Sequence, residues 1–156
     1  MAEETHAISF DEPGTDVCIC SLEQTLLAVK GSYVQRVLPY QAVTYVPGCP
    51  DYVLGVIYVR GNIESVIDLR SVAAIPKTGD LQNGKILIVE DERMRTGILF
   101  DTVEDMYRLS DAQLEPPVHT LPEGLKPLVN GTFSWHERPV VLLDMAQVIS
   151  RIFEGG

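Results

Sequence analysis

Long apolar runs and basic residues are both scarce in this sequence of 156 residues. No apolar run reaches the roughly 18 residues that a membrane-spanning helix needs, so direct membrane insertion is not expected. Only 12 lysine and arginine residues stand against 22 aspartate and glutamate residues, and the net charge of -10 repels a phosphate backbone. Nucleic acid is therefore not an expected partner. The acidic start, Met1–His6, lacks the basic residues and the apolar core of a secretory signal, which indicates a cytoplasmic protein.

Cysteine and histidine are also few, which limits metal and redox chemistry. Cys18, Cys20 and Cys49 match neither a disulfide framework nor a zinc site with paired C-x-x-C ends. The simplest interpretation is that they are small buried apolar residues. Cys18 and Cys20 would share one face of a strand, and a metal clip with a histidine is the weaker alternative; the candidate ligands are His6, His119 and His136. We expect no metal and no cofactor.

Short β-rich segments joined by polar turns account for most of the chain. Residues 1–14 are expected to be a disordered leader, because acidic residues accompany only scattered apolar ones. Prolines between residues 39 and 50 exclude a central strand there, and residues 33–38 fit either a helical turn or a bulged strand. Only residues 145–153 carry enough apolar residues at helical spacing to predict a helix. The predicted class is mostly β, with hairpins over residues 17–29, 53–69, 85–103 and 128–143.

An internal repeat sets the expected architecture. Gly55–Val72 (GVIYVRGNIESVIDLRSV) aligns without a gap to Gly131–Val148 (GTFSWHERPVVLLDMAQV). In both, a glycine opens a strand, a polar turn follows, and the second strand ends in Asp68 or Asp144, each a predicted N-cap of a short helix. Two similar barrels of about 70 residues explain the repeat, and because neither could bury much surface alone, we expect a shared interface with a groove.

The repeat also carries a family resemblance. Gly55–Ile63 (GVIYVRGNI), followed by Val66–Arg70 (VIDLR), resembles the region of CheW-like domains in which a strand ending in Arg-Gly turns into a strand ending in Val-Asp-Leu-Arg. Gly97–Val103 (GILFDTV) also agrees with the family pattern, and the resemblance extends over residues 16–153. It implies two tandem, intertwined five-stranded SH3-like barrels with short helices and a C-terminal helix. It further implies a non-catalytic scaffold adaptor that couples bacterial chemoreceptors to the regulatory domain of a CheA-type histidine kinase.

In this family, receptors bind an apolar groove between the barrels and the kinase binds exposed faces near the hairpin ends. Arg60 in the Arg-Gly turn is the polar candidate, although it could simply be solvated or pair with Glu64. Asn62 departs from the family, in which an apolar pair and a proline often follow this turn. Trp135, the only tryptophan, is predicted to be a contact anchor at another hairpin tip. The candidate partner-binding residues are Arg60, Asn62, Val34, Val37, Ile98, Val103 and Trp135, of which the aliphatic ones face either the groove or the core.

Other functions remain open at this stage. The adaptor could serve a non-flagellar pathway, such as surface motility or second-messenger control. A small-molecule-binding β-barrel module would instead need a closed pocket with convergent polar groups. A regulatory domain of a larger kinase is a third alternative, against which Met1 and the terminal Gly155-Gly156 argue. Ser134, His136 and Glu137 contain the elements of a nucleophilic site, but neighbours on one hairpin do not converge, so we expect no enzyme.

Overall fold

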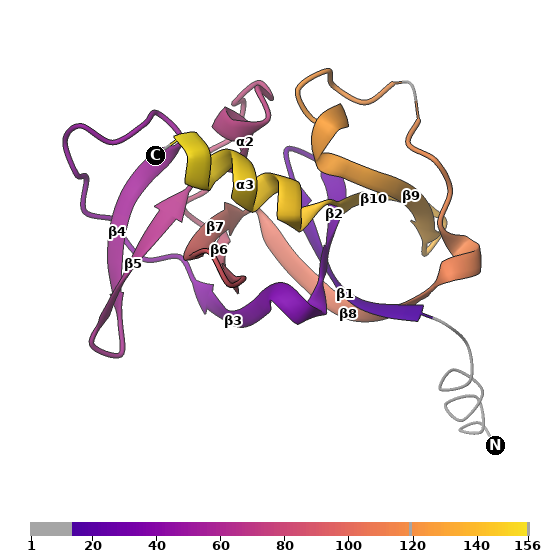
Figure 1. The fold of residues 1–156 in the computed structure, drawn as a ribbon, viewed down its shortest axis with the longest axis horizontal. Coiled ribbons are helices and arrows are strands. Elements are labelled where there is room, and N and C mark those ends of the chain that lie inside the picture. Colours follow the sequence, from indigo (N-terminus) through magenta and orange to yellow (C-terminus); the bar gives the residue numbers. More distant parts are fainter. Residues whose placement is uncertain (1–13, 119, 156) are drawn as a thin grey trace.

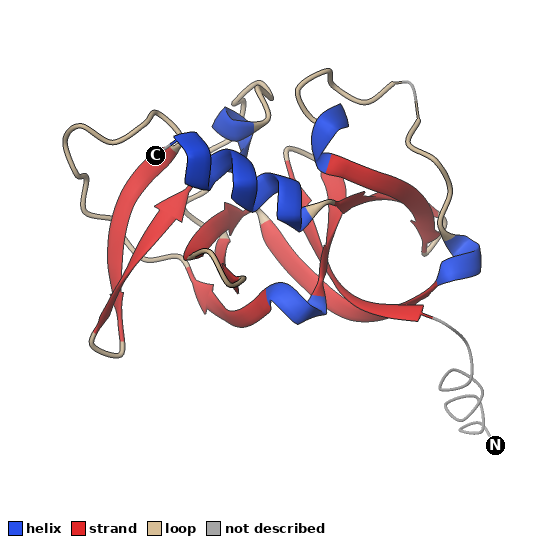
Figure 2. Ribbon diagram, in the orientation of Figure 1, coloured by secondary structure: helices blue, strands red, loops and turns tan. Residues whose placement is uncertain are grey.

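A computed structural model describes residues 14–118 and 120–155, and ten strands dominate this part of the chain (Figures 1 and 2). The predicted leader lies outside the described residues except for Gly14, where the first strand begins. His6 and His119 also lie outside them. The ten strands form two five-stranded sheets, which confirms the mostly β class.

The sheet with strand order β8-β1-β2-β10-β9 is barrel A, and the sheet with order β3-β6-β7-β5-β4 is barrel B. In each barrel one pairing is parallel, β2 with β10 or β5 with β7, and the others are antiparallel. Barrel A consists of β1 (Gly14–Leu22), β2 (Thr25–Lys30), β8 (Thr102–Ser110), β9 (Val129–Trp135) and β10 (Arg138–Leu143). Barrel B consists of β3 (Val34–Pro39), β4 (Val53–Val59), β5 (Asn62–Ile67), β6 (Lys85–Glu90) and β7 (Arg95–Phe100). The helical segments are η1 (Gly31–Tyr33), α2 (Leu69–Val72), η2 (Asp111–Gln113), η3 (Lys126–Leu128) and α3 (Met145–Gly155).

Each barrel takes strands from both halves of the chain. The β1–β2 hairpin lies in barrel A, but β3, β4 and β5 belong to barrel B; β6 and β7 complete barrel B, and β8 to β10 return to barrel A. The intertwined barrels implied by the resemblance are therefore confirmed. Barrel B is one continuous segment, residues 34–100, and barrel A is formed by the two segments that flank it, residues 14–30 and 102–143. Because strands of the other half complete each sheet, neither half can pair all of its backbone groups alone.

A hydrophobic core continues from one barrel into the other. Along β1, Val17 and Ile19 belong to the interior of barrel A, whereas Cys18 and Cys20 belong to a larger core that also contains Ile98 of barrel B. Strands β2 and β10 alternate in the same way, so these three strands are buried on both faces. The expected shared interface is confirmed.

The glycines that open the two repeat units allow a loop to cross each barrel edge. Thr44 exchanges two backbone hydrogen bonds of 2.9 Å with β4, and Glu115 exchanges two of 2.8 Å with β9. A Cβ atom on Gly55 would lie 2.2 Å from the carbonyl oxygen of Thr44, and one on Gly131 would lie 2.5 Å from that of Glu115. Any side chain would therefore collide with the crossing backbone.

The two repeat units also end as predicted. The Asp68 carboxylate accepts a hydrogen bond from the Arg70 backbone N–H at 3.0 Å, and the Asp144 carboxylate accepts one from the Gln147 backbone N–H at 3.2 Å. Both are N-cap contacts that satisfy free amides at a helix start.

The structure differs from the sequence prediction at two strands. The strand expected over residues 97–103 breaks at Asp101, whose backbone N–H donates to the Ser21 carbonyl at 2.9 Å where the chain passes from β7 to β8. The sequence does not predict β8, because Leu109 is its only fully buried residue and polar side chains fill most of the rest.

Candidate partner-binding site

The β4–β5 hairpin projects from barrel B and ends in the turn Arg60-Gly61, at the lower left of Figure 1. These residues have positive φ angles of 52° and 85°, as a two-residue hairpin turn requires. Arg60 and Asn62 are exposed. Beside them, Tyr58 and Ile63 form a cross-strand pair and are 67% and 60% exposed.

Sequence reasoning missed Tyr58 and Ile63, although a signal was present. Tyr58 lies between the buried residues Ile57 and Val59, so strand alternation turns its side chain to the opposite face, and Ile63 is its cross-strand partner on that face. We define the tip surface as Tyr58, Arg60, Asn62 and Ile63. Two large apolar side chains side by side on a projecting hairpin, with polar neighbours, are typical of a contact surface.

Glu64 does not pair with Arg60. The Glu64 residue is only 5% exposed, and its carboxylate accepts a hydrogen bond from Arg95 Nε at 2.7 Å, which ties β5 to β7. The proposed Arg60–Glu64 salt bridge is therefore wrong.

The three candidate valines lie on the outer strands β3 and β8. Val37 is 44% exposed, whereas Val34 and Val103 are half-buried against the shared core. Val34 sits where β3 leaves the single turn η1, and the pairing of β3 with β6 is irregular between Val34 and Arg36. Residues 34–38 thus form the bulged alternative, and Tyr33 ends the turn η1. A receptor-binding role for these valines stays a prediction.

Ile98 does not belong to this surface. Its side chain is fully buried in the shared core, and the residue pairs with Ile67 of β5 and Leu87 of β6. An isoleucine with no exposed surface cannot contact a partner in this structure, so its prediction as a contact residue is corrected. Strand β7 is buried at every residue from Thr96 to Phe100, as is typical of a strand that is covered on both faces.

Trp135 lies at the end of β9, beside a turn in which His136 and Glu137 have positive φ angles of 52° and 63°. Its ring is half-buried against the interior of barrel A. The His136 ring meets it edge-on, with ring centroids 4.3 Å apart and an interplanar angle of 89°. Part of the indole therefore supports the hairpin, and its role as a contact anchor stays a prediction.

A cavity lies in barrel A. Its volume is about 780 Å³, and it is bounded by β9, β10 and the loop that follows η2. Glu115, Ser134 and Arg138 contribute polar groups, and Leu26 and Phe133 contribute apolar ones. The groove expected between the barrels remains a prediction.

Metal chemistry finds no support in the described ranges, 14–118 and 120–155. No group of three or more histidine, cysteine, aspartate or glutamate side chains there is arranged to hold a metal ion. The hydrogen bond with Cys18, together with burial, raises the pKa of the Cys20 thiol, which disfavours the thiolate that binds metals. None of the helices in this part of the chain combines the length and the apolar character needed to cross a membrane.

Comparisons with known proteins agree with the geometry. A sequence profile described as CheW-like domain matches residues 16–153. The chain is 27% identical over 117 residues to a chemotaxis protein CheW of Klebsiella aerogenes, covering 75% of this chain and 70% of that protein. It is 28% identical over 99 residues to a chemotaxis protein CheW of Bacillus subtilis, covering 64% and 61%. The crystal structure of the scaffolding protein TtCheW from Thermoanaerobacter tengcongensis superposes with a TM-score of 0.72 and 26% identity, covering 83% of this chain and 88% of that one.

Proposed function

Since the chain belongs to the CheW-like domain family, a family of non-catalytic scaffold adaptors in chemotaxis, we propose that it couples chemoreceptors to a CheA-type histidine kinase. The family match spans nearly the whole described fold, and both barrels that the family requires are present. We expect the protein in the cytoplasm, at receptor arrays, where a fluorescent fusion should co-localise with the receptors.

The exposed tip surface is the main observation that supports a kinase contact. Tyr58 and Ile63 together expose two large apolar side chains, and a partner that covers them removes apolar surface from water, which favours binding. Arg60 lies between them in the sequence and supplies a charged group that can fix the register of the contact.

The receptor contact would use the outer strands β3 and β8. Receptor tips present helices, and a helix packs on an apolar floor whose polar edge sets its orientation. Val37 is the best-exposed apolar residue among the candidates on these strands, with Val34 and Val103 contributing the parts of their surfaces that stay accessible. The two partners would thus bind different strands of the molecule.

Calorimetry against the kinase regulatory domain and a receptor tip fragment from the same organism tests this proposal. Ile63→Ser should weaken kinase binding by tenfold or more and leave receptor binding unchanged, whereas Val37→Ser should do the reverse. Phe153→Ser is the matched control, because Phe153 is 54% exposed on α3, away from both surfaces. If the unmodified chain binds neither partner, or if Phe153→Ser weakens binding as much as Ile63→Ser, the proposal is wrong.

A further inference from the structure

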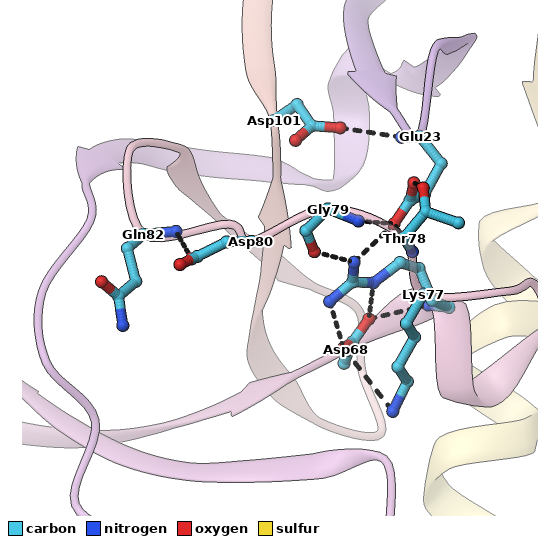
Figure 3. A network of polar contacts seen from close by, with 9 residues as sticks. Glu23, Asp68, Lys77, Thr78, Gly79, Asp80, Gln82 and Asp101 are labelled. Carbon is cyan, nitrogen blue, oxygen red and sulfur yellow. Dashed lines mark hydrogen bonds and ion pairs between the residues drawn. The ribbon is translucent and has the colours of Figure 1, made fainter.

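The turn between β1 and β2 of barrel A places the Glu23 carboxylate against residues of barrel B. Glu23 Oε2 accepts hydrogen bonds from Arg70 Nη1 at 2.6 Å and from the backbone N–H groups of Thr78 and Gly79 at 3.0 and 3.1 Å (Figure 3). The other oxygen, Oε1, accepts from the Thr78 hydroxyl. One carboxylate of barrel A thereby holds both the helix α2 and the loop that follows it.

Contacts within barrel B orient the Arg70 guanidinium independently of Glu23. The Asp68 carboxylate accepts hydrogen bonds from Arg70 Nε and Nη2, each at 3.0 Å, in the two-pronged geometry that orients a guanidinium. The Gly79 carbonyl accepts from Arg70 Nη1 at 2.7 Å, and the Arg70 residue is only 7% exposed. Asp68, the helix cap predicted from the sequence, therefore also aims Arg70 at barrel A.

The turn that carries Glu23 is itself fixed. The backbone N–H of Glu23 donates to Asp101 Oδ2 at 2.7 Å, and Glu23 adopts a positive φ of 50° (Figure 3). Asp101 is the residue at which the chain crosses from barrel B to barrel A. The contact therefore joins the crossover, the β1–β2 turn and α2 at one point.

The second repeat unit takes part in an equivalent contact between the barrels, but that contact is weaker. At the tip of the β6–β7 hairpin of barrel B, Arg93 Nη2 donates to the Ala146 carbonyl of α3 at 3.0 Å. Ala146 occupies in the second repeat unit the position of Arg70 in the first. The Arg93 contact across the barrels is one hydrogen bond to a neutral carbonyl, whereas the Arg70 guanidinium is bound by the carboxylates of Glu23 and Asp68. Hydrogen bonds between charged groups are roughly twice as strong as those between neutral groups.

We infer that the Glu23–Arg70 contact is a clamp that fixes the orientation of barrel A relative to barrel B. Burial of the shared apolar core holds the barrels together but has no preferred direction, whereas hydrogen bonds between charged groups are directional. The clamp is a property of the isolated chain and holds whether or not the proposed adaptor function is correct.

Residual dipolar couplings of backbone amides test the clamp directly, because they report how each barrel is oriented in one common frame. In the unmodified protein a single alignment tensor should fit the couplings of both barrels. In Glu23→Ala the couplings should require two tensors with different orientation or amplitude. The matched control is Glu92→Ala, which removes an exposed carboxylate from the β6–β7 tip and should keep the single tensor.

Two further variants separate orientation from folding. Arg93→Ala removes the counterpart contact and should disturb the common tensor less than Glu23→Ala does. If Glu23→Ala does not fold, Glu23→Gln takes its place, since the amide removes the charge and one of the two acceptor oxygens but keeps the other. A folded Glu23 variant whose two barrels still fit one tensor as well as the unmodified protein would overturn the inference.

Discussion

Replacing Ile98 with alanine should lower the stability of both barrels together. The Ile98 side chain is fully buried in the core that the barrels share, between β5 and β6. Removing a buried isoleucine down to alanine lowers the free energy of unfolding by about 2–5 kcal/mol. With a urea m-value of about 2 kcal/mol per molar for a domain of this size, the midpoint should fall by about 1–2.5 M.

Two optical probes then distinguish a shared core from two independent ones. The fluorescence of Trp135 reports on barrel A, whereas far-ultraviolet circular dichroism reports on all strands. Both probes should give one midpoint in the unmodified protein and one lower midpoint in Ile98→Ala. A Trp135 transition that stays at its original urea concentration, while the dichroism signal changes earlier, would refute the shared-core reasoning. Val37→Ala, at an exposed position, should change the unfolding free energy by less than about 0.5 kcal/mol.

Three further predictions follow from particular contacts. Gly55→Ala should destabilise the fold in urea titrations by more than the roughly 1–3 kcal/mol that a positive φ costs, because its Cβ would also overlap a backbone carbonyl. Gly48→Ala, with a φ of 86° and nothing within 4 Å of its Cβ, should show the cost of the positive φ alone. A thiol reagent should modify Cys49 rapidly and the two buried cysteines only on unfolding, and fast reaction of all three thiols would contradict their burial. The hydrogen bonds from Thr78 and Arg70 lower the pKa of Glu23 to about 2, so its stabilising effect is complete above about pH 4.3 and is lost as the pH falls towards 2. The difference in Tm between the unmodified protein and Glu23→Gln should shrink across that interval, and a constant difference would show that the carboxylate is not held in this way.

Much of the local structure was determined by the sequence itself. The glycine-to-aspartate repeat predicted two hairpins and their helix caps, and the structure confirms both caps at Asp68 and Asp144. These features depend on neighbours within a few residues, such as turn geometry, capping oxygens and period-two alternation, so a short segment contains all the information they need. Through the family resemblance, the same local motifs also predicted the correct overall architecture.

The candidate site was predicted only in part. Arg60 and Asn62 lie on an exposed tip as their turn residues suggested, but Tyr58 and Ile63 were missed and Ile98 was misplaced. An apolar residue on a strand reads the same in sequence whether it faces a core or solvent. Which one it faces depends on how far the strand extends beyond its sheet and on what covers its second face.

The exchange of the β1–β2 and β6–β7 hairpins between the two halves of the chain was decided only by the tertiary structure. A sequence shows which segments are strands, whereas partner choice depends on contacts between residues far apart in the chain. The strand β8 is the clearest case, since its polar pattern gives no signal and its place in barrel A comes from pairing with β1. The convergence of Glu23, Asp68, Arg70 and Asp101 is of the same kind. Their charges gave no sign of a common site along the sequence, and they meet because the chain crosses between two sheets that share one core.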